Sequence, residues 1–208
     1  MRKGTFILLC WLWPAIFNIV TAHAGDFKLV GQEKQISLFE RWIPSAKDMT
    51  VRELKAVFVV HSDIPAIVKL LQDEHRSARW NVNAADFKIL KTGTEDHWIS
   101  YTRYDIPWPM DDQDCCLAYE LSGDFNRTVI NFRSISSRYF PVSTDVERIT
   151  GVRGKWILQK QEDSSIKVVY LITTDRSKKV PRWISDKIIH SNLYNTMAAF
   201  KAMAEQAS

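Results

Sequence analysis

The stretch RYDIPWPMDDQD, Arg103–Asp114, separates two segments that both have the composition of β-strands. Proline has no backbone N–H to donate to a sheet ladder, so strand pairing must stop at Pro107 and Pro109. The residue before each proline is also pushed toward an extended conformation. We therefore expect a stiff crossing between two sheet strands here and not a tight turn.

On both sides of this crossing the sequence has the pattern of an antiparallel sheet. Polar or glycine-bearing turns at 92–96, 122–126 and 161–165 predict hairpins between neighbouring strands. The strands are expected in the segments rich in β-branched and aromatic residues, Leu54–Val60, Ala85–Lys91, His97–Tyr104, Cys115–Leu121, Thr128–Ile135, Lys155–Lys160 and Ile166–Thr174.

Helices are expected before, between and after these strands. The apolar spacing of Asp26–Trp42 predicts a helix, and Ser62–Pro65 supplies an N-cap and an early proline for a short helix. The longest predicted helix, Pro181–Glu205, carries two adjacent apolar stripes. Such stripes suit a helix closing over a concave sheet, or simply a broad core-facing surface. Hairpins followed by a terminal helix make the fold class α+β.

The first 24 residues have the layout of a secretory signal peptide. They combine the basic residues Arg2 and Lys3, an apolar run at 6–20 and the cleavage tripeptide Ala22-His23-Ala24. The run contains Pro14 and is shorter than the roughly 20 apolar residues of a membrane-spanning helix. We expect cleavage after this tripeptide, with export to the periplasm or, as the alternative, secretion from the cell.

Removal of residues 1–24 leaves 25–208, or 184 of the 208 residues, which is the size of one domain. The formal charge falls from +4 to +2 because Arg2 and Lys3 are lost with the leader. This small charge gives no indication of nucleic-acid binding. We expect a monomer without a cofactor.

Two adjacent cysteines, Cys115 and Cys116, remain in the mature chain. Neighbouring Cα atoms lie about 3.8 Å apart, which is shorter than disulfide geometry allows, and adjacent strand residues point to opposite faces. We therefore expect two free thiols. Without a CxxC motif, a zinc or redox role has little support.

Four motifs occur in the order found in the START family, the steroidogenic-acute-regulatory-related lipid transfer domains, and the chain resembles that family from about Val51 to Ala204. They are RSARW with Trp80, YDIPWPMDDQDCCLAYEL at 104–121, GKWIL with Gly154 and Trp156, and VVYLITTD followed by VPRWI at 168–184. The resemblance implies a helix-grip fold, in which a curved antiparallel β-sheet surrounds a long C-terminal α-helix. Residues 25–208 would then form a START-like domain with an apolar tunnel for one lipid.

Two positions depart from the family pattern. Gln113 stands where the family has an arginine before the junction aspartate, and DRSKK at 175–179 replaces the usual Asp-Pro-Gly approach to the last helix. The family's ligand preferences are therefore not carried over to this chain. Burial of each methylene stabilises a bound chain by roughly 0.8 kcal/mol, so a tunnel can hold a lipid without any chemistry.

Strand alternation and the resemblance together predict the ligand-binding residues, which come from two strands and the last helix: Tyr101, Arg103, Leu117, Tyr119, Ile184 and Ile188. Arg103 would pair with a lipid head group or carboxylate if it faces the tunnel. Alternatively it is a surface arginine near Asp105 or Asp114, because unpaired charges are seldom buried.

The resemblance places one further segment beside the tunnel mouth, and a basic cluster lies at the entrance to the last helix. The polar connection at 136–151 is long enough to act as a gate or to be disordered. Lys178, Lys179 and Arg182 form a basic cluster that either touches an anionic membrane transiently or is a solvated charge run.

The sequence gives little support for an enzyme. His61, His75, His97 and His190 form no metal-binding pair, and the acidic residues at 111–114 lack the remaining ligands of a calcium loop. We expect binding of a lipid or other hydrophobic molecule. The alternatives are a polyketide-cyclase-type enzyme using Arg103 and Tyr119 to polarise a carbonyl, and an interaction domain with a filled interior, which a cavity of less than a few hundred Å³ would favour.

Overall fold

The structure is a computed structural model that describes residues 25–44, 50–106, 111–174 and 182–206, without the side chains of 174 and 182–185. Three expectations fall outside these residues: the leader at 1–24, the proline crossing at 107–110, and the cluster of Lys178, Lys179 and Arg182. These stay predictions.

The described residues form one sheet of ten strands. The strand order is β1-β2-β3-β10-β9-β7-β6-β5-β4, with every neighbour on this path antiparallel, and β8 pairs with β6 in parallel. The strands are β1 Lys28–Glu33, β2 Ile36–Pro44, β3 Thr50–Val60, β4 Ala84–Lys91, β5 His97–Tyr104, β6 Gln113–Gly123, β7 Arg127–Ser134, β8 Glu147–Arg148, β9 Arg153–Lys160 and β10 Ile166–Thr174.

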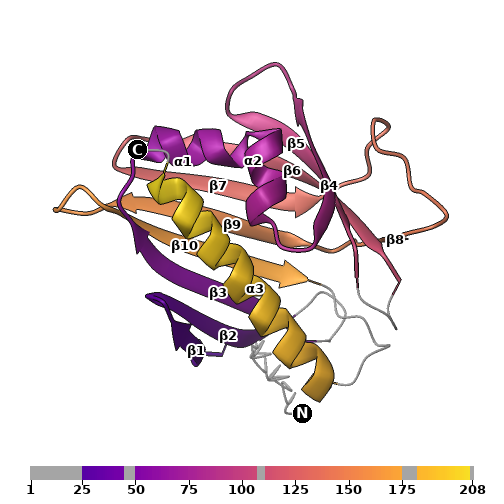
Figure 1. Cartoon of the computed structure of the whole chain (residues 1–208), viewed down its shortest axis with the longest axis horizontal. Coiled ribbons are helices and arrows are strands. Elements are labelled where there is room, and N and C mark those ends of the chain that lie inside the picture. Colours follow the sequence, from indigo (N-terminus) through magenta and orange to yellow (C-terminus); the bar gives the residue numbers. More distant parts are fainter. Residues whose placement is uncertain (1–24, 45–49, 107–110, 175–181, 207–208) are drawn as a thin grey trace, which may run out of the picture.

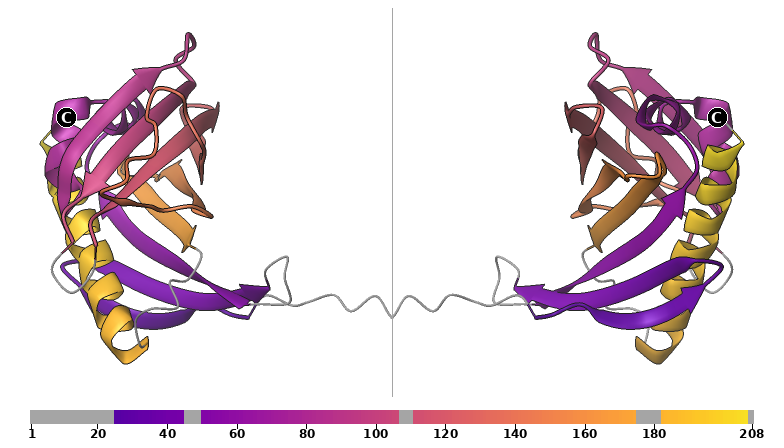
Figure 2. Two further views of the ribbon diagram at one scale, coloured as in Figure 1. Left: turned by 90° about the vertical axis from the view of Figure 1, so that its right-hand side faces the viewer. Right: turned by 90° about the vertical axis from the view of Figure 1, so that its left-hand side faces the viewer.

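The helices are α1 Ile64–Leu71, α2 Glu74–Trp80 and α3 Arg182–Glu205. The sheet curls strongly, and α3 runs along its concave side with α1 and α2 beside its C-terminal end (Figures 1 and 2). This is the curved antiparallel sheet around a long C-terminal helix that the sequence predicts, so the expected α+β architecture is confirmed.

Local signals explain where the short helices begin. The side chain of Asp63 accepts a hydrogen bond of 2.7 Å from the Ala66 N–H, and proline follows in the first turn of α1. Asp73 caps α2 in the same way through the Arg76 N–H at 3.0 Å. Each cap satisfies a backbone donor that the helix leaves unpaired. The predicted helix after Pro65 is confirmed.

The helix predicted at Asp26–Trp42 is wrong. These residues form the β1–β2 hairpin, in which Ile36 and Leu38 face the core with exposures of 0% and 4%. The turn residues Lys34 and Gln35 have positive φ values of 45° and 63°. Tight hairpins require positive φ and usually contain Asn or Gly there, so a Lys-Gln turn gives no recognisable hairpin signal.

The core is aromatic where α3 meets the sheet. Phe200 of α3 is fully buried and lies 4.7 Å from Trp156, 5.1 Å from Trp80 and 6.3 Å from Phe58, measured between ring centroids. Edge-on and tilted contacts of this kind are favourable beyond the area they bury. They fix the C-terminal half of α3 against β3, β9 and α2.

Polar contacts hold the other half of α3 to the edge of the sheet. Arg52 of β3 pairs with Asp186 at 2.6 Å, and the imidazole of His190 lies 3.1 Å from the Glu40 carboxylate of β2.

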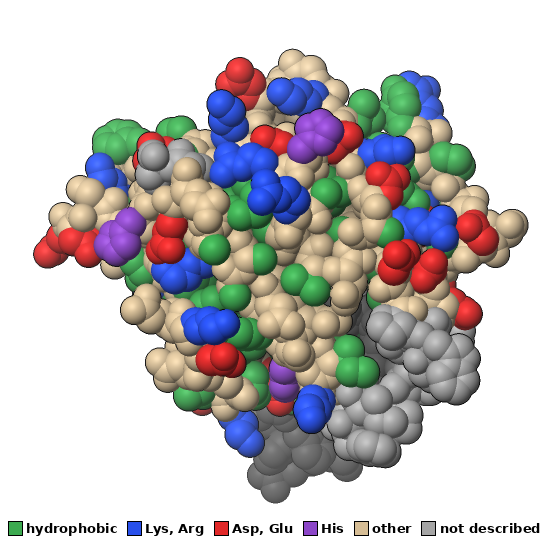
Figure 3. Space-filling model, in the orientation of Figure 1, with side chains coloured by type: hydrophobic (Ala, Val, Ile, Leu, Met, Phe, Trp, Pro, Cys, Tyr) green, Lys and Arg blue, Asp and Glu red, His purple; other side chains and the backbone are tan. Residues whose placement is uncertain are grey.

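Over the face in Figure 3, basic and acidic side chains are interspersed. Within the described ranges, no helix has both the length and the apolarity needed to cross a bilayer.

Cys115 and Cys116 are free and buried, as predicted. They point to opposite faces of β6: Cys115 joins the core, and Cys116 lies opposite Tyr101 of β5. Burial raises the pKa of both thiols, to about 12 for Cys115. Both therefore stay protonated and uncharged at neutral pH.

Candidate functional site

A cavity of about 280 Å³ lies between α3, the end of α2 and the inner face of the sheet. Every second residue at the start of β6 contributes to its wall, because alternate strand residues share a face. These residues change from polar to aromatic along the strand: Gln113, Cys115, Leu117 and Tyr119.

Aromatic side chains form much of the apolar wall. The ring centroids of Trp156 and Tyr170 are 4.5 Å apart, and Trp80 lies 6.2 Å from Trp156. Ile172 of β10 and Met197 of α3 complete this apolar part. Large rigid rings with few rotamers make a surface that is already shaped before any ligand enters.

Neutral polar groups gather where β5 ends and β6 begins. Tyr104 pairs with Gln113 across these strands, and its hydroxyl accepts a hydrogen bond of 3.4 Å from the carboxamide of Asn81. On the α3 side, the Thr196 hydroxyl accepts from the Val82 N–H at 3.4 Å. The cavity therefore has an apolar part and a polar part. The remaining polar wall residues are Asn83, Thr102 and Asn192.

The tyrosine hydroxyls of the wall stay protonated. Burial is the first cause that raises the pKa of Tyr104, Tyr119 and Tyr170. A phenolate would lose its hydration here without gaining a cationic partner. These hydroxyls can donate or accept hydrogen bonds, but they carry no charge into the cavity.

Two of the six predicted ligand-binding residues, Leu117 and Tyr119, line the cavity. Ile188 of α3 is 40% exposed and lies outside the wall. The side chain of Ile184 is outside the described residues. Neither isoleucine is thus placed against the cavity.

Tyr101 and Arg103 lie on the other face of the sheet. The β5–β6 register places Tyr101 opposite Cys116 and Ser100 opposite Leu117. Directly opposed residues share a face, so Leu117 can point inward only if Tyr101 and Arg103 point outward. Tyr101 instead stacks on Phe140 of the 136–151 connection, at 5.0 Å between ring centroids. The predicted tunnel-facing placement of Tyr101 and Arg103 is therefore wrong.

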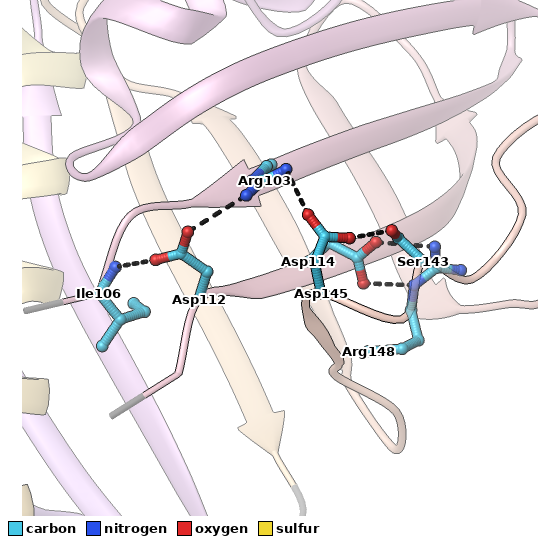
Figure 4. Close-up of polar contacts among 7 residues, drawn as sticks. All are labelled: Arg103, Ile106, Asp112, Asp114, Ser143, Asp145 and Arg148. Carbon is cyan, nitrogen blue, oxygen red and sulfur yellow. Dashed lines mark hydrogen bonds and ion pairs between the residues drawn. The ribbon is translucent and has the colours of Figure 1, made fainter. Parts of the chain in front are cut away.

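Arg103 belongs to an ionic cluster on that outer face (Figure 4). It lies 3.3 Å from each of the Asp112 and Asp145 carboxylates. Asp112 also accepts from the Ile106 N–H at 3.2 Å. Arg103 is therefore a surface arginine near acidic residues, as the alternative prediction has it. Its partners are Asp112 and Asp145 and not the predicted Asp105 and Asp114.

A second ion pair lies beside it. Arg148 of β8 forms a two-pronged pair with Asp114 of β6, including an Nη2–Oδ2 contact of 2.8 Å, and Asp114 is completely buried. Arg148 also donates to the carbonyl oxygens of Phe140 and Pro141 at 3.3 and 3.2 Å. These contacts fasten Phe140 and Pro141 of the 136–151 connection to Arg148 at the outer face, whereas Ile149, near the end of the connection, lines the cavity.

The cyclase alternative requires Arg103 and Tyr119 to act on one carbonyl. The two residues lie on opposite faces of the sheet, Arg103 in the outer ionic cluster and Tyr119 in the cavity wall. They cannot approach the same atom. Within the described ranges, no group of three potential metal ligands occurs either.

Several wall residues carry no signal in the sequence. Asn81, Asn83 and Asn192 come from the segment after α2 and from α3, and only the fold brings them together. An asparagine after a helix is an ordinary turn residue. By contrast, Trp156 and Tyr170 belong to motifs that the resemblance singles out.

Residues 31–207 match the model of the START domain. The chain belongs to the START domain family. This START domain is also 24% identical over 196 residues to the uncharacterised protein PA1579 of Pseudomonas aeruginosa, across 94% of this chain and 95% of the relative. The predicted family membership is confirmed.

Two solved structures share the fold. One is named a STAR-related lipid transfer protein from Xanthomonas axonopodis, with a TM-score of 0.73, 19% identity and coverage of 86% of this chain and 98% of that chain. The other is the Zhui aromatase/cyclase from Streptomyces sp. R1128, with a TM-score of 0.56, 15% identity and coverage of 75% and 94%. At these identities the likeness concerns the fold alone.

Proposed function

We propose that this START domain binds one molecule of a lipid or another hydrophobic ligand in the cavity between the sheet and α3, without changing it chemically. The observation that carries the proposal is the wall itself, which is mainly apolar and aromatic with a few convergent neutral polar groups. Ligand sites in proteins have this composition. The name of the Xanthomonas structure points the same way.

The size of the cavity limits the ligand. Its volume of about 280 Å³ lies just below the range for ligand sites, roughly 300–1,000 Å³. This favours a single hydrocarbon chain or a compact ring system over a lipid with two long chains. The volume alone does not decide between ligand binding and an interaction domain with a filled interior; the composition of the wall favours ligand binding.

Binding is a better account than catalysis. The cavity wall of the described residues holds no acid–base pair and no activated nucleophile, since its only thiol, that of Cys115, has a pKa of about 12. The fold is shared with a cyclase as well as with a lipid transfer protein, so it does not decide the matter. The apolar wall favours ligand binding over catalysis.

We further propose that the mature START domain begins at Gly25 and works as a monomer in the periplasm, with transient contact to a membrane. The layout of residues 1–24 supports export. Transfer, storage and sensing all require the same binding step. The intact mass of the exported chain tests the cleavage position, since retention of the leader would contradict it.

Replacing Leu117 with tryptophan should block uptake of a hydrophobic ligand. The larger side chain would project from β6 into the cavity and occupy the space between the sheet and α3. We expect affinity for a fluorescent long-chain lipid supplied from liposomes to fall at least about tenfold. The matched control is Glu120→Trp, an exposed position on the same strand.

Both variants must retain the wild-type circular dichroism and melt cooperatively. Loss of uptake in Leu117→Trp alone supports binding in the cavity. Equal uptake by wild type and both variants would contradict it, because the ligand would then bind elsewhere. Absence of uptake by the wild type after organic extraction would contradict ligand binding altogether.

A further inference from the structure

We propose that the cavity selects an uncharged ligand with a hydrogen-bonding head group, such as a hydroxyl, carbonyl or ester, and rejects ionised lipids of the same chain length. This inference rests on the proposed function and defines its ligand class. It depends on which groups form the wall and on which of them lack partners.

The first observation is the absence of charge. Within the described part of the chain, no Asp, Glu, Lys, Arg or His lines the cavity. The nearby Asp114 and Arg148 satisfy each other in the outer ionic cluster. An ionised head group in the cavity would lose its hydration and gain no opposite charge, which strongly disfavours burial.

The second observation concerns the groups that could titrate. Cys115, Tyr104, Tyr119 and Tyr170 are the titratable side chains in the described wall, and burial raises the pKa of each. None of them becomes charged at neutral pH. The wall cannot provide a counter-charge by losing a proton.

The third observation is a set of unused hydrogen-bonding groups. Trp80 belongs to the cavity wall and is only 7% exposed, and its indole N–H is buried without a hydrogen-bond partner. Among the described residues, the half-buried carboxamides of Gln113 and Asn192 and the exposed one of Asn83 also have no hydrogen-bond partner within the protein. Buried polar groups are normally paired, so an oxygen on a ligand would give the Trp80 indole the partner that it lacks. The carboxamides would exchange hydrogen bonds with water for hydrogen bonds with the same ligand group.

These groups match a neutral oxygen function. A carboxamide both donates and accepts hydrogen bonds, and the Trp80 indole donates only. A ligand hydroxyl can exchange both kinds of bond with the carboxamides, and a carbonyl or ester oxygen can accept from the donors. The hydrocarbon part would lie against Trp156, Tyr170 and Met197 at the apolar part of the cavity.

Gln113 gives a direct way to reverse the preference. It is a wall residue at the polar part of the cavity, and the family resemblance predicts an arginine at this position. Gln113→Arg would place a cation beside the head group. Gln32→Arg is the matched control, because it makes the same change at an exposed position of β1.

The experiment compares a long-chain alcohol, its methyl ether, the carboxylate and the ammonium ion at one chain length. Each displaces a fluorescent lipid from delipidated protein at neutral pH. For wild type and Gln32→Arg, we expect the two neutral probes to bind at least about tenfold more tightly than either ion. For Gln113→Arg, we expect the carboxylate to gain at least about tenfold relative to the alcohol.

The outcomes separate this inference from the proposed function. If all four probes bind and the carboxylate binds at least as tightly as the alcohol, the inference is overturned and ligand binding is left intact. Failure of every probe and of the fluorescent lipid to bind would overturn the proposed function instead. An unchanged alcohol-to-carboxylate ratio in a folded Gln113→Arg would contradict the placement of the head group beside Gln113.

Discussion

Replacing Arg148 with methionine should destabilise the START domain by about 3 kcal/mol, because it leaves the carboxylate of Asp114 buried without its partner. Asp114 is 0% exposed and Arg148 only 9% exposed. The pair is two-pronged, which makes it stronger than a single contact. We take the lower end of the range for a broken buried pair because Arg148 keeps some contact with solvent.

The measurement is urea unfolding at neutral pH, followed by circular dichroism. Arg103→Met is the matched control, since Arg103 belongs to the same outer cluster but is 37% exposed in its side chain. Exposed ion pairs stabilise little, so its midpoint should stay close to that of the wild type. Equal losses in the two variants would contradict the central role given to the Arg148–Asp114 pair.

Gly154→Ala should also destabilise the domain by about 3 kcal/mol, through overpacking. A Cβ at this position would lie 2.1 Å from the Leu171 carbonyl oxygen of β10 and 2.4 Å from the Phe132 ring. The ring could move, but the carbonyl belongs to a strand that is paired on both sides. A glycine within a strand often marks such a close approach.

Gly31→Ala is the matched control for this substitution. Gly31 also lies in a strand, β1, but nothing is within 4 Å of the position of its Cβ. We expect a change of no more than about 0.5 kcal/mol. The comparison is made by thermal and urea unfolding. A Gly154→Ala protein as stable as the Gly31→Ala protein would show that β9 and β10 can separate to accept a methyl group.

Local patterns in the sequence were sufficient to predict most of the fold. The strand at Leu54–Val60 and the hairpin at 92–96 follow from composition and turn residues, and the structure has β3, β4 and β5 there. The final helix follows from proline at its start and apolar spacing. The β1–β2 hairpin was missed because its turn, Lys34-Gln35, adopts positive φ without the usual residues.

The cavity was predictable only in part. Alternation places Leu117 and Tyr119 on one face of β6, and both line the cavity. The face of β5 could not be derived in the same way, because the crossing at 105–112 gives no turn geometry that would fix the register with β6. A slip of one residue exchanges the two faces of a strand. This is why Tyr101 and Arg103 were placed inward.

The polar part of the wall was not predictable. Asn83 precedes β4, Gln113 begins β6 and Asn192 is on α3, and only the fold brings them to one cavity wall. No spacing rule connects them. Gln113 was noticed only as a departure from the family pattern, and the structure gives this departure a location in the cavity.

Photolabelling tests the central claim most directly. A long-chain alcohol carrying a diazirine near its hydrocarbon end is bound to the delipidated domain, illuminated, and the modified peptides are identified by mass spectrometry. Binding in the cavity predicts labels on wall residues of α3 and β10, such as Met197 and Ile172, which unlabelled alcohol suppresses. Labels confined to exposed outer residues, such as Phe125, Tyr139 and Val142, would contradict it.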